Sequence, residues 1–140
     1  MNINDLQQKA ESGSIPAKSI LGICYLDGLD VDIDYAKAFQ LLSEAAANGA
    51  SRAIVNLARM YAQGLGVPAD IREAIRLYES VGNFEFLAAI ELGRIYSRSL
   101  GVASDRSKAA HWYGIAVSQQ STVVDCDELR EAKAYLAGKS

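Results

Sequence analysis

Apolar residues between positions 53 and 61 follow the spacing of a helix face. Leu57, Ala58 and Tyr61 stand four, five and eight positions after Ala53, which places all four on one side of an α-helix. A small residue beside the leucine allows a second helix to approach closely. The pattern therefore predicts a helix with one buried face, packed tightly against a neighbour.

A glycine-rich turn and a second helix follow this pattern. The turn reads Gly-Leu-Gly-Val at residues 64–67, and glycine just after a helix takes a positive φ without strain. Asp70 and Glu73 have the spacing of a capping box, which predicts a helix starting at Asp70. The apolar positions of this second helix are Ala74, Leu77, Tyr78 and Val81. The stretch is predicted to fold as helix, turn, helix.

The same stretch occurs three times, at offsets of 36 residues back and 35 residues forward. The matching positions before it are Ala17, Leu21, Tyr25, Gly28, Leu29, Val31, Asp34 and Ala38, and those after it are Ala88, Leu92, Tyr96, Ser99, Leu100, Val102, Asp105 and Ala109. A period of this length is typical of one helical hairpin stacked on copies of itself. We therefore predict an all-α fold, a right-handed α/α superhelix (solenoid) of three helix-turn-helix repeats. Their expected bounds are residues 15–49, 51–83 and 86–118.

Partial capping helices are expected at both ends of the stack, because the terminal repeats of a solenoid need a polar outer face. Residues 4–12 align with the end of a repeat and would cap the N-terminal side. A final helix is predicted over residues 122–137, starting near Thr122 and Asp125. Its expected apolar side consists of Cys126, Leu129, Ala132 and Leu136. All 140 residues would then form a single domain.

The repeated residues resemble those of a known family, the Sel-one-like repeat, a relative of the tetratricopeptide repeat. The resemblance rests on Leu21-Gly22, Tyr25, Gly28, Lys37-Ala38 and Ala45-Ala46 in the first repeat, and on Leu92-Gly93, Tyr96, Gly101-Val102, Asp105, Lys108-Ala109 and Trp112 in the third. The chain departs from the family pattern at Asp30 and Ser99, where glycine is usual, and at Leu41 and Leu77, where tryptophan is usual. The resemblance implies an α/α solenoid whose members mostly act as adaptors or scaffolds in protein complexes.

Composition narrows the range of functions. The net charge is −3 and the pI about 5.1, which argues against a nucleic-acid binder because such proteins usually carry a basic stripe. No apolar run approaches the 18 or so residues of a membrane span, and the N-terminus lacks the pattern of a signal peptide. Cys24 and Cys126 are expected to be unpaired, which suits a reducing compartment. We therefore expect a cytoplasmic protein that does not bind membranes.

Three stretches imitate chemical motifs. Residues 64–69 match a dinucleotide-binding fingerprint, but a helix rather than a strand precedes them. The aspartates at 30, 32 and 34 imitate a calcium loop, but its sixth position is Tyr35 instead of glycine. His111 is the only histidine, so no Ser-His-Asp or Cys-His set can be assembled from it. We expect no catalysis, no cofactor, no metal and no small-molecule substrate.

A partner protein is expected to bind the face of each first helix that lies opposite the repeat core. In tetratricopeptide-like solenoids the first helices line the concave groove. The positions that would form this site are Ile20, Ile23, Arg52, Asn56, Arg59, Glu91, Arg94 and Arg98. The four arginines would attract an acidic or extended segment. The sequence thus predicts an adaptor or scaffold module, with an inhibitor such as an immunity protein that neutralises a toxin or effector enzyme as the alternative.

Overall fold

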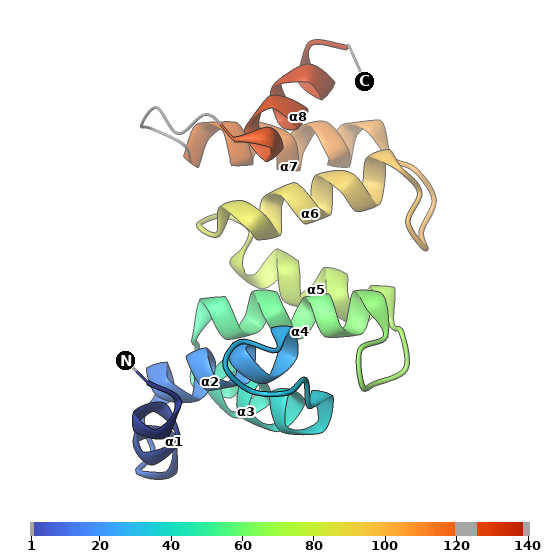
Figure 1. Ribbon diagram of the computed structural model, residues 1–140. Helices are drawn as coiled ribbons and strands as arrows, with labels where there is room; N and C mark the ends of the chain where they lie inside the picture. The colour runs from blue at the N-terminus through green and yellow to red at the C-terminus, as the bar shows by residue number, and fades with distance from the viewer. Residues whose placement is uncertain (1, 120–125, 139–140) are drawn as a thin grey trace. The chain divides into compact units, whose positions relative to one another are not determined.

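Eight α-helices and no strand make up the described residues, 2–119 and 126–138, of the computed structural model (Figure 1). The helices are α1 (Ile3–Glu11), α2 (Ile15–Asp27), α3 (Tyr35–Ala47), α4 (Ser51–Gln63), α5 (Ile71–Val81), α6 (Phe86–Ser97), α7 (Arg106–Gln119) and α8 (Asp127–Leu136). The predicted all-α helical-repeat fold is confirmed.

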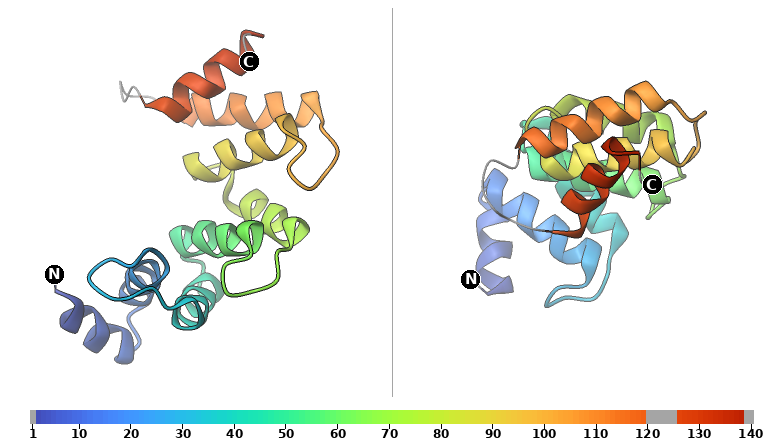
Figure 2. Two further views of the ribbon diagram at one scale, coloured as in Figure 1. Left: turned by 45° about the vertical axis from the view of Figure 1, so that its right-hand side comes forward. Right: turned by 90° about the horizontal axis from the view of Figure 1, so that it is seen from above.

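The helices belong to two compact units, Met1–Leu77 and Tyr78–Ser140. In the first unit α2 packs against α1, α3 and α4, and α3 also packs against α4. In the second unit α6 and α7 pack as an antiparallel pair, and α8 crosses α7 (Figure 2).

The repeated apolar positions form the core of both units. In the first unit Leu42 and Met60 are among the largest fully buried side chains, and in the second Tyr113, Ile90 and Leu92 are. The small repeat residues are buried as well: Ala17, Ala38, Ala53, Ala74, Ala88 and Ala109. Most of the stability of these helices therefore comes from packing of one apolar face.

Two glycines mark the closest approach of paired helices, as their position beside the repeat leucine predicted. A Cβ atom built on Gly22 of α2 would lie 2.8 Å from Cγ of Leu42 on α3. A Cβ atom on Gly93 of α6 would lie 2.7 Å from the ring of Tyr113 on α7. A Cβ atom at either point would force the neighbouring side chain or helix to shift, because real Cβ contacts are longer than this.

The turn between the two helices of a repeat is closed by the same backbone bonds each time. The N–H of the capping aspartate donates to the tyrosine carbonyl nine residues earlier, in the pairs Asp34–Tyr25 at 2.9 Å, Asp70–Tyr61 at 2.8 Å and Asp105–Tyr96 at 3.0 Å. Each aspartate side chain also caps the following helix, accepting from the N–H of Lys37, Glu73 or Lys108 at 3.0–3.1 Å. Side-chain caps of this kind stabilise a helix by about 1 kcal/mol.

The two departures from the family's glycine pattern leave the backbone of the turn unchanged. Asp30 has φ +63° and Ser99 has φ +52°. Their counterparts in the second repeat, Gly66 and Gly64, have φ +74° and +68°. The turn therefore requires a left-handed backbone conformation at these positions whatever the residue. Ser99 adopts this conformation at a steric cost.

Replacing Ser99 by glycine should raise the free energy of unfolding by about 0.5–1 kcal/mol. A left-handed conformation costs an L-residue about 1–2 kcal/mol, and glycine removes this cost. The greater freedom of glycine in the unfolded chain lowers the gain by about 0.4–1 kcal/mol. Urea unfolding of the variant measures the difference. Ser104→Gly is the control, since Ser104 lies in the same turn without a positive φ and its replacement should lower stability. Equal losses for both variants would contradict the proposed strain at Ser99.

The capping helices differ in how well the sequence predicted them. At the N-terminus α1 buries Leu6 and Ala10, and Asn2 caps it. At the C-terminus α8 runs from Asp127 to Leu136 with Cys126 as its N-cap, within the predicted range of 122–137. The expected start at Thr122 and Asp125 lies outside the described residues. Leu129 and Ala132 are buried as predicted, but Leu136 is 45% exposed and does not belong to the core.

Candidate functional site

In the first unit the predicted binding residues lie on α2 and α4, which pack against each other. Ile20 on α2 is 42% exposed, and Ile23, one turn further on, is half-buried. Arg52 on α4 is exposed, and Asn56 bonds back to the Arg52 carbonyl at 2.9 Å. Among the described residues Arg52 makes no ion pair. The two helices thus expose an isoleucine on α2 and an arginine on α4.

Arg59, on the same face of α4, is already engaged within the unit. Its Nη2 atom lies 2.8 Å from Oδ1 of Asp27 at the end of α2. Its Nε atom is buried without a hydrogen-bond partner. The side chain is therefore held between the two helices, and a partner carboxylate would have to compete with Asp27 for Arg59.

In the second unit the predicted residues Glu91, Arg94 and Arg98 take part in an ion-pair network with α8. Arg94 donates from Nη1 to Glu91 at 2.7 Å, and from Nε and Nη2 to Glu131 at 3.0 and 2.7 Å. Arg98 donates to the other oxygen of Glu131 at 2.6 Å. The Tyr113 hydroxyl reaches the same carboxylate at 3.2 Å. One glutamate of α8 thus binds two arginines and a tyrosine.

The network holds its groups in their charged forms. Hydrogen bonding to Glu131 is the main cause that raises the pKa of Arg94 above its ordinary value. The bond from Arg94 in turn lowers the pKa of Glu131, against the opposing effect of burial. Both groups therefore stay ionised at neutral pH, and the pair is a charge-assisted, bidentate contact of the strong kind.

The predicted face is less positive than its sequence indicated, because intrachain carboxylates neutralise most of its arginines. The arginines at 59, 94 and 98 each face a carboxylate of the same unit. The sequence prediction missed Glu131 because α8 lies outside the three repeats, so no repeat position pointed to it. Of the four arginines, Arg52 is the one that the described structure leaves without an ionic partner.

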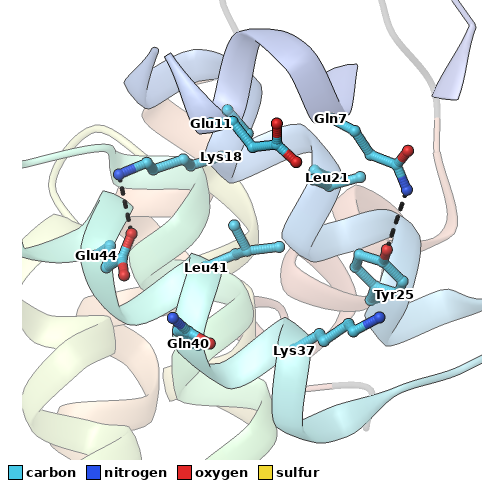
Figure 3. Close-up of a pocket in the computed structure, with 10 residues that line it drawn as sticks. Gln7, Glu11, Lys18, Leu21, Tyr25, Lys37, Gln40, Leu41 and Glu44 are labelled. Carbon is cyan, nitrogen blue, oxygen red and sulfur yellow. Dashed lines mark hydrogen bonds and ion pairs between the residues drawn. The ribbon is translucent and has the colours of Figure 1, made fainter. Parts of the chain in front are cut away.

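A hollow of about 530 Å³ lies between α1, α2 and α3 in the first unit (Figure 3). Lys18 on its rim forms an ion pair with Glu44 at 2.9 Å, which lowers the pKa of that glutamate. Gln7 donates to the Tyr25 hydroxyl at 3.3 Å, and the Lys37 ammonium lies 5.2 Å from the Tyr25 ring centre. Charges of both signs line this hollow, and no nucleophile stands beside a base among its described side chains.

The motifs that imitate chemical sites have structural roles. In the acidic turn Asp34 caps α3 and Asp27 pairs with Arg59. Within the described ranges no group of three or more histidine, cysteine, aspartate or glutamate side chains could hold a metal ion. His111 is exposed, with its ring edge-on to Trp112 at 5.0 Å. None of the described helices combines the length and the apolar character needed to cross a membrane.

Both cysteines are free thiols. Cys24 is buried in α2, as expected for a small core residue, and Cys126 is half-buried. Burial is the main cause that raises the pKa of the Cys24 thiol, and the negative charges of Asp30 and Asp27 raise it further. Because the thiolate is the reactive form, Cys24 is poorly suited to act as a nucleophile.

Comparison with known proteins connects this arrangement to a family. The Sel1 repeat model matches residues 15–49, 51–80 and 87–121. A Sel1 repeat protein from Oxalobacter formigenes is 34% identical, with a TM-score of 0.72 and 97% of each chain covered. The structure of c5321, a protective antigen of uropathogenic Escherichia coli with an SLR fold, is 30% identical with a TM-score of 0.82, over 99% of this chain and 29% of that one.

A rat protein also matches part of the sequence. DAP3-binding cell death enhancer 1 of Rattus norvegicus is 34% identical over 74 residues, which is 53% of this chain. The match covers 14% of the length of the rat protein. This similarity therefore concerns repeats within a much longer chain.

Proposed function

We propose that this chain, which belongs to the Sel1 repeat family, is a non-enzymatic module that binds a partner protein through the exposed faces of its first helices. Sel1 repeat proteins generally mediate protein–protein interactions. One relative is named for binding the protein DAP3, and the proposal for this chain is of the same general kind. It is an adaptor or scaffold role without chemistry of its own.

The observation that carries the proposal is the face formed by Ile20, Ile23 and Arg52 on α2 and α4. These residues vary between repeats: Ile20 corresponds to Asn56 and Glu91, while Arg52 corresponds to Pro16 and Leu87. The fold does not depend on their identity, because Ile20 and Arg52 are exposed while the repeated core positions of the same helices are buried. Residues that are dispensable for the fold are free to specify a partner.

The chemistry of this face fits a segment that carries both an apolar and an acidic side chain. Ile20 and Ile23 would contact the apolar side chain, with the exposed part of Ile20 becoming buried. Arg52 would bind the carboxylate through its two-pronged guanidinium group, and arginine is enriched among residues that dominate binding energy. An extended acidic segment with alternating apolar residues would meet both requirements.

The test is quantitative capture of the native partner with a variant of this face. Ile20→Asp combined with Arg52→Glu should weaken binding of the captured partner at least about tenfold, or roughly 1.4 kcal/mol. The apolar contact and the ion pair are both lost in this variant. Binding is measured by biolayer interferometry with the purified partner, after circular dichroism has shown that the variant has native helicity. The identity of the partner also decides between an adaptor and an inhibitor of a toxin or effector enzyme.

A matched control makes the same chemical changes elsewhere in the first unit. Ile33→Asp combined with Arg72→Glu replaces one exposed isoleucine and one exposed arginine that lie off the first helices. This variant should bind within about twofold of the wild type, because the two residues lie outside the proposed contact face. It should also fold normally, since exposed substitutions change stability by only about 0.5 kcal/mol. If the control pair loses binding and the α2–α4 pair keeps it, the partner binds another surface.

A further inference from the structure

Arg94, Arg98 and Tyr113 together form a built binding site for a carboxylate. Arg94 lies on α6, Arg98 is the C-cap residue of α6, and Tyr113 lies on α7. The two helices pack tightly through Gly93. The bound carboxylate of Glu131 accepts from Arg94 at 2.7 and 3.0 Å, from Arg98 at 2.6 Å and from Tyr113 at 3.2 Å. Two arginines on one carboxylate exceed what a surface ion pair usually provides.

The site stays open to solvent at one side. The Glu131 side chain is 23% exposed, and the side chain of Arg98 is more than half exposed. A hollow of about 480 Å³ adjoins the pair and is lined by Ser97, Arg98, Tyr113, Glu131, Ala134 and Tyr135. A carboxylate from outside the chain could therefore reach Arg98 without unfolding of either helix.

We propose that Arg94, Arg98 and Tyr113 are a binding site for an acidic side chain of the partner protein, and that Glu131 occupies this site in the free chain as an intramolecular competitor. The inference rests on the proposed function, because it assumes that the chain binds a protein. It adds a second contact region, on α6, and a form of regulation. A partner must replace one carboxylate by another before this region contributes to binding.

The physical consequence is a reduced affinity for acidic segments. An intramolecular group competes at an effective concentration in the millimolar range or above. The apparent dissociation constant then rises by the inverse of the fraction of molecules in which the site is vacant. The exchange itself leaves the arginines paired throughout, so no buried charge is left uncompensated. Weak acidic ligands are excluded, while a partner anchored elsewhere on the chain can displace Glu131.

A short fluorescein-labelled poly-glutamate peptide serves as the probe. Fluorescence anisotropy should show that Glu131→Gln binds this peptide at least about tenfold more tightly than the wild type, because Arg98 loses its intrachain partner while Arg94 keeps Glu91. The matched control is Glu128→Gln, which removes the same charge from the same helix. Among the described contacts Glu128 has none with either arginine, so this variant should stay within about twofold of the wild type.

Two results would overturn the inference. One is equal affinity of the Glu131→Gln and Glu128→Gln variants for the peptide, because the gain would then reflect net charge alone. The other is measured by NMR on the wild-type chain, so it does not depend on the folding of a variant. Saturating peptide should shift the Nε–H resonances of Arg94 and Arg98 and the carboxyl carbon resonance of Glu131. Unchanged resonances mean that the ion pairs are purely structural. The α2–α4 capture experiment uses other residues, so its result remains independent.

Discussion

Replacing Gly93 by leucine should lower the free energy of unfolding by about 2 kcal/mol. A Cβ atom at this position would lie 2.7–2.8 Å from three ring atoms of Tyr113. The ring cannot withdraw easily, because Tyr113 is only 1% exposed and its hydroxyl is bonded to Glu131. Overpacking of a tight core typically costs 1–3 kcal/mol. The gain in helix propensity on replacing glycine, about 1 kcal/mol, offsets only part of that cost, and the bulk of leucine beyond Cβ adds to it.

Thermal and urea unfolding of a matched alanine pair isolate the contact from helix propensity. Gly93→Ala introduces a Cβ into the contact with Tyr113, whereas Gly114→Ala introduces one where no atom lies within 4 Å. The first variant should lose stability and the second should gain about 0.5–1 kcal/mol, since glycine is unfavourable inside a helix. A gain for both variants would show that α6 and α7 can move apart freely at Gly93.

Replacing Gly66 by alanine should lower the free energy of unfolding by about 2–3 kcal/mol. Gly66 has φ +74°, a conformation that costs an L-residue about 1–2 kcal/mol. Its Cβ would also lie 2.5 Å from Cβ of Tyr35, at the start of α3. A Cβ atom is fixed to the backbone, so relief of this contact requires movement of the turn or of α3 itself. Strain and overpacking therefore add at this position.

Gly49→Ala separates the two contributions to the Gly66 result. Gly49 has φ +80°, and a Cβ built on it would meet no atom within 4 Å. This variant should show the backbone strain alone, about 1–2 kcal/mol. Urea unfolding of both variants gives the difference. Similar losses at the two positions would mean that the contact with Tyr35 has no energetic weight.

The repeat pattern predicted the features that depend on short-range spacing. Helix pairs, aspartate caps and the close approach at Gly22 and Gly93 all follow from local sequence, because a helix face has a fixed period. The turn at Ser99 kept its left-handed backbone although its glycine is missing. The closing backbone bonds of this turn are kept as well, so the substitution changes the energy of the conformation more than its shape.

The pattern failed where partners come from different helices. Arg59 was expected to contribute to partner binding, and the pattern did not show that it pairs with Asp27, thirty-two residues earlier. Arg94 and Arg98 pair with Glu131 on α8. Periodicity tells which side of a helix a residue occupies, but not which charged side chain lies opposite on the next helix. Gly82 was also missed: a Cβ there would lie 2.5 Å from the Trp112 ring, a contact set by packing between helices.

The backbone closure of the turns explains how this fold tolerates sequence divergence. The second repeated bond in each turn runs from the leucine N–H to a carbonyl five residues earlier, in the pairs Leu29–Cys24, Leu65–Met60 and Leu100–Ile95. Three different side chains stand at the acceptor position while the bond keeps its length, 2.9–3.1 Å. Mutations that spare the glycines, the small helix-contact residues and the capping aspartates can therefore accumulate with little effect on shape.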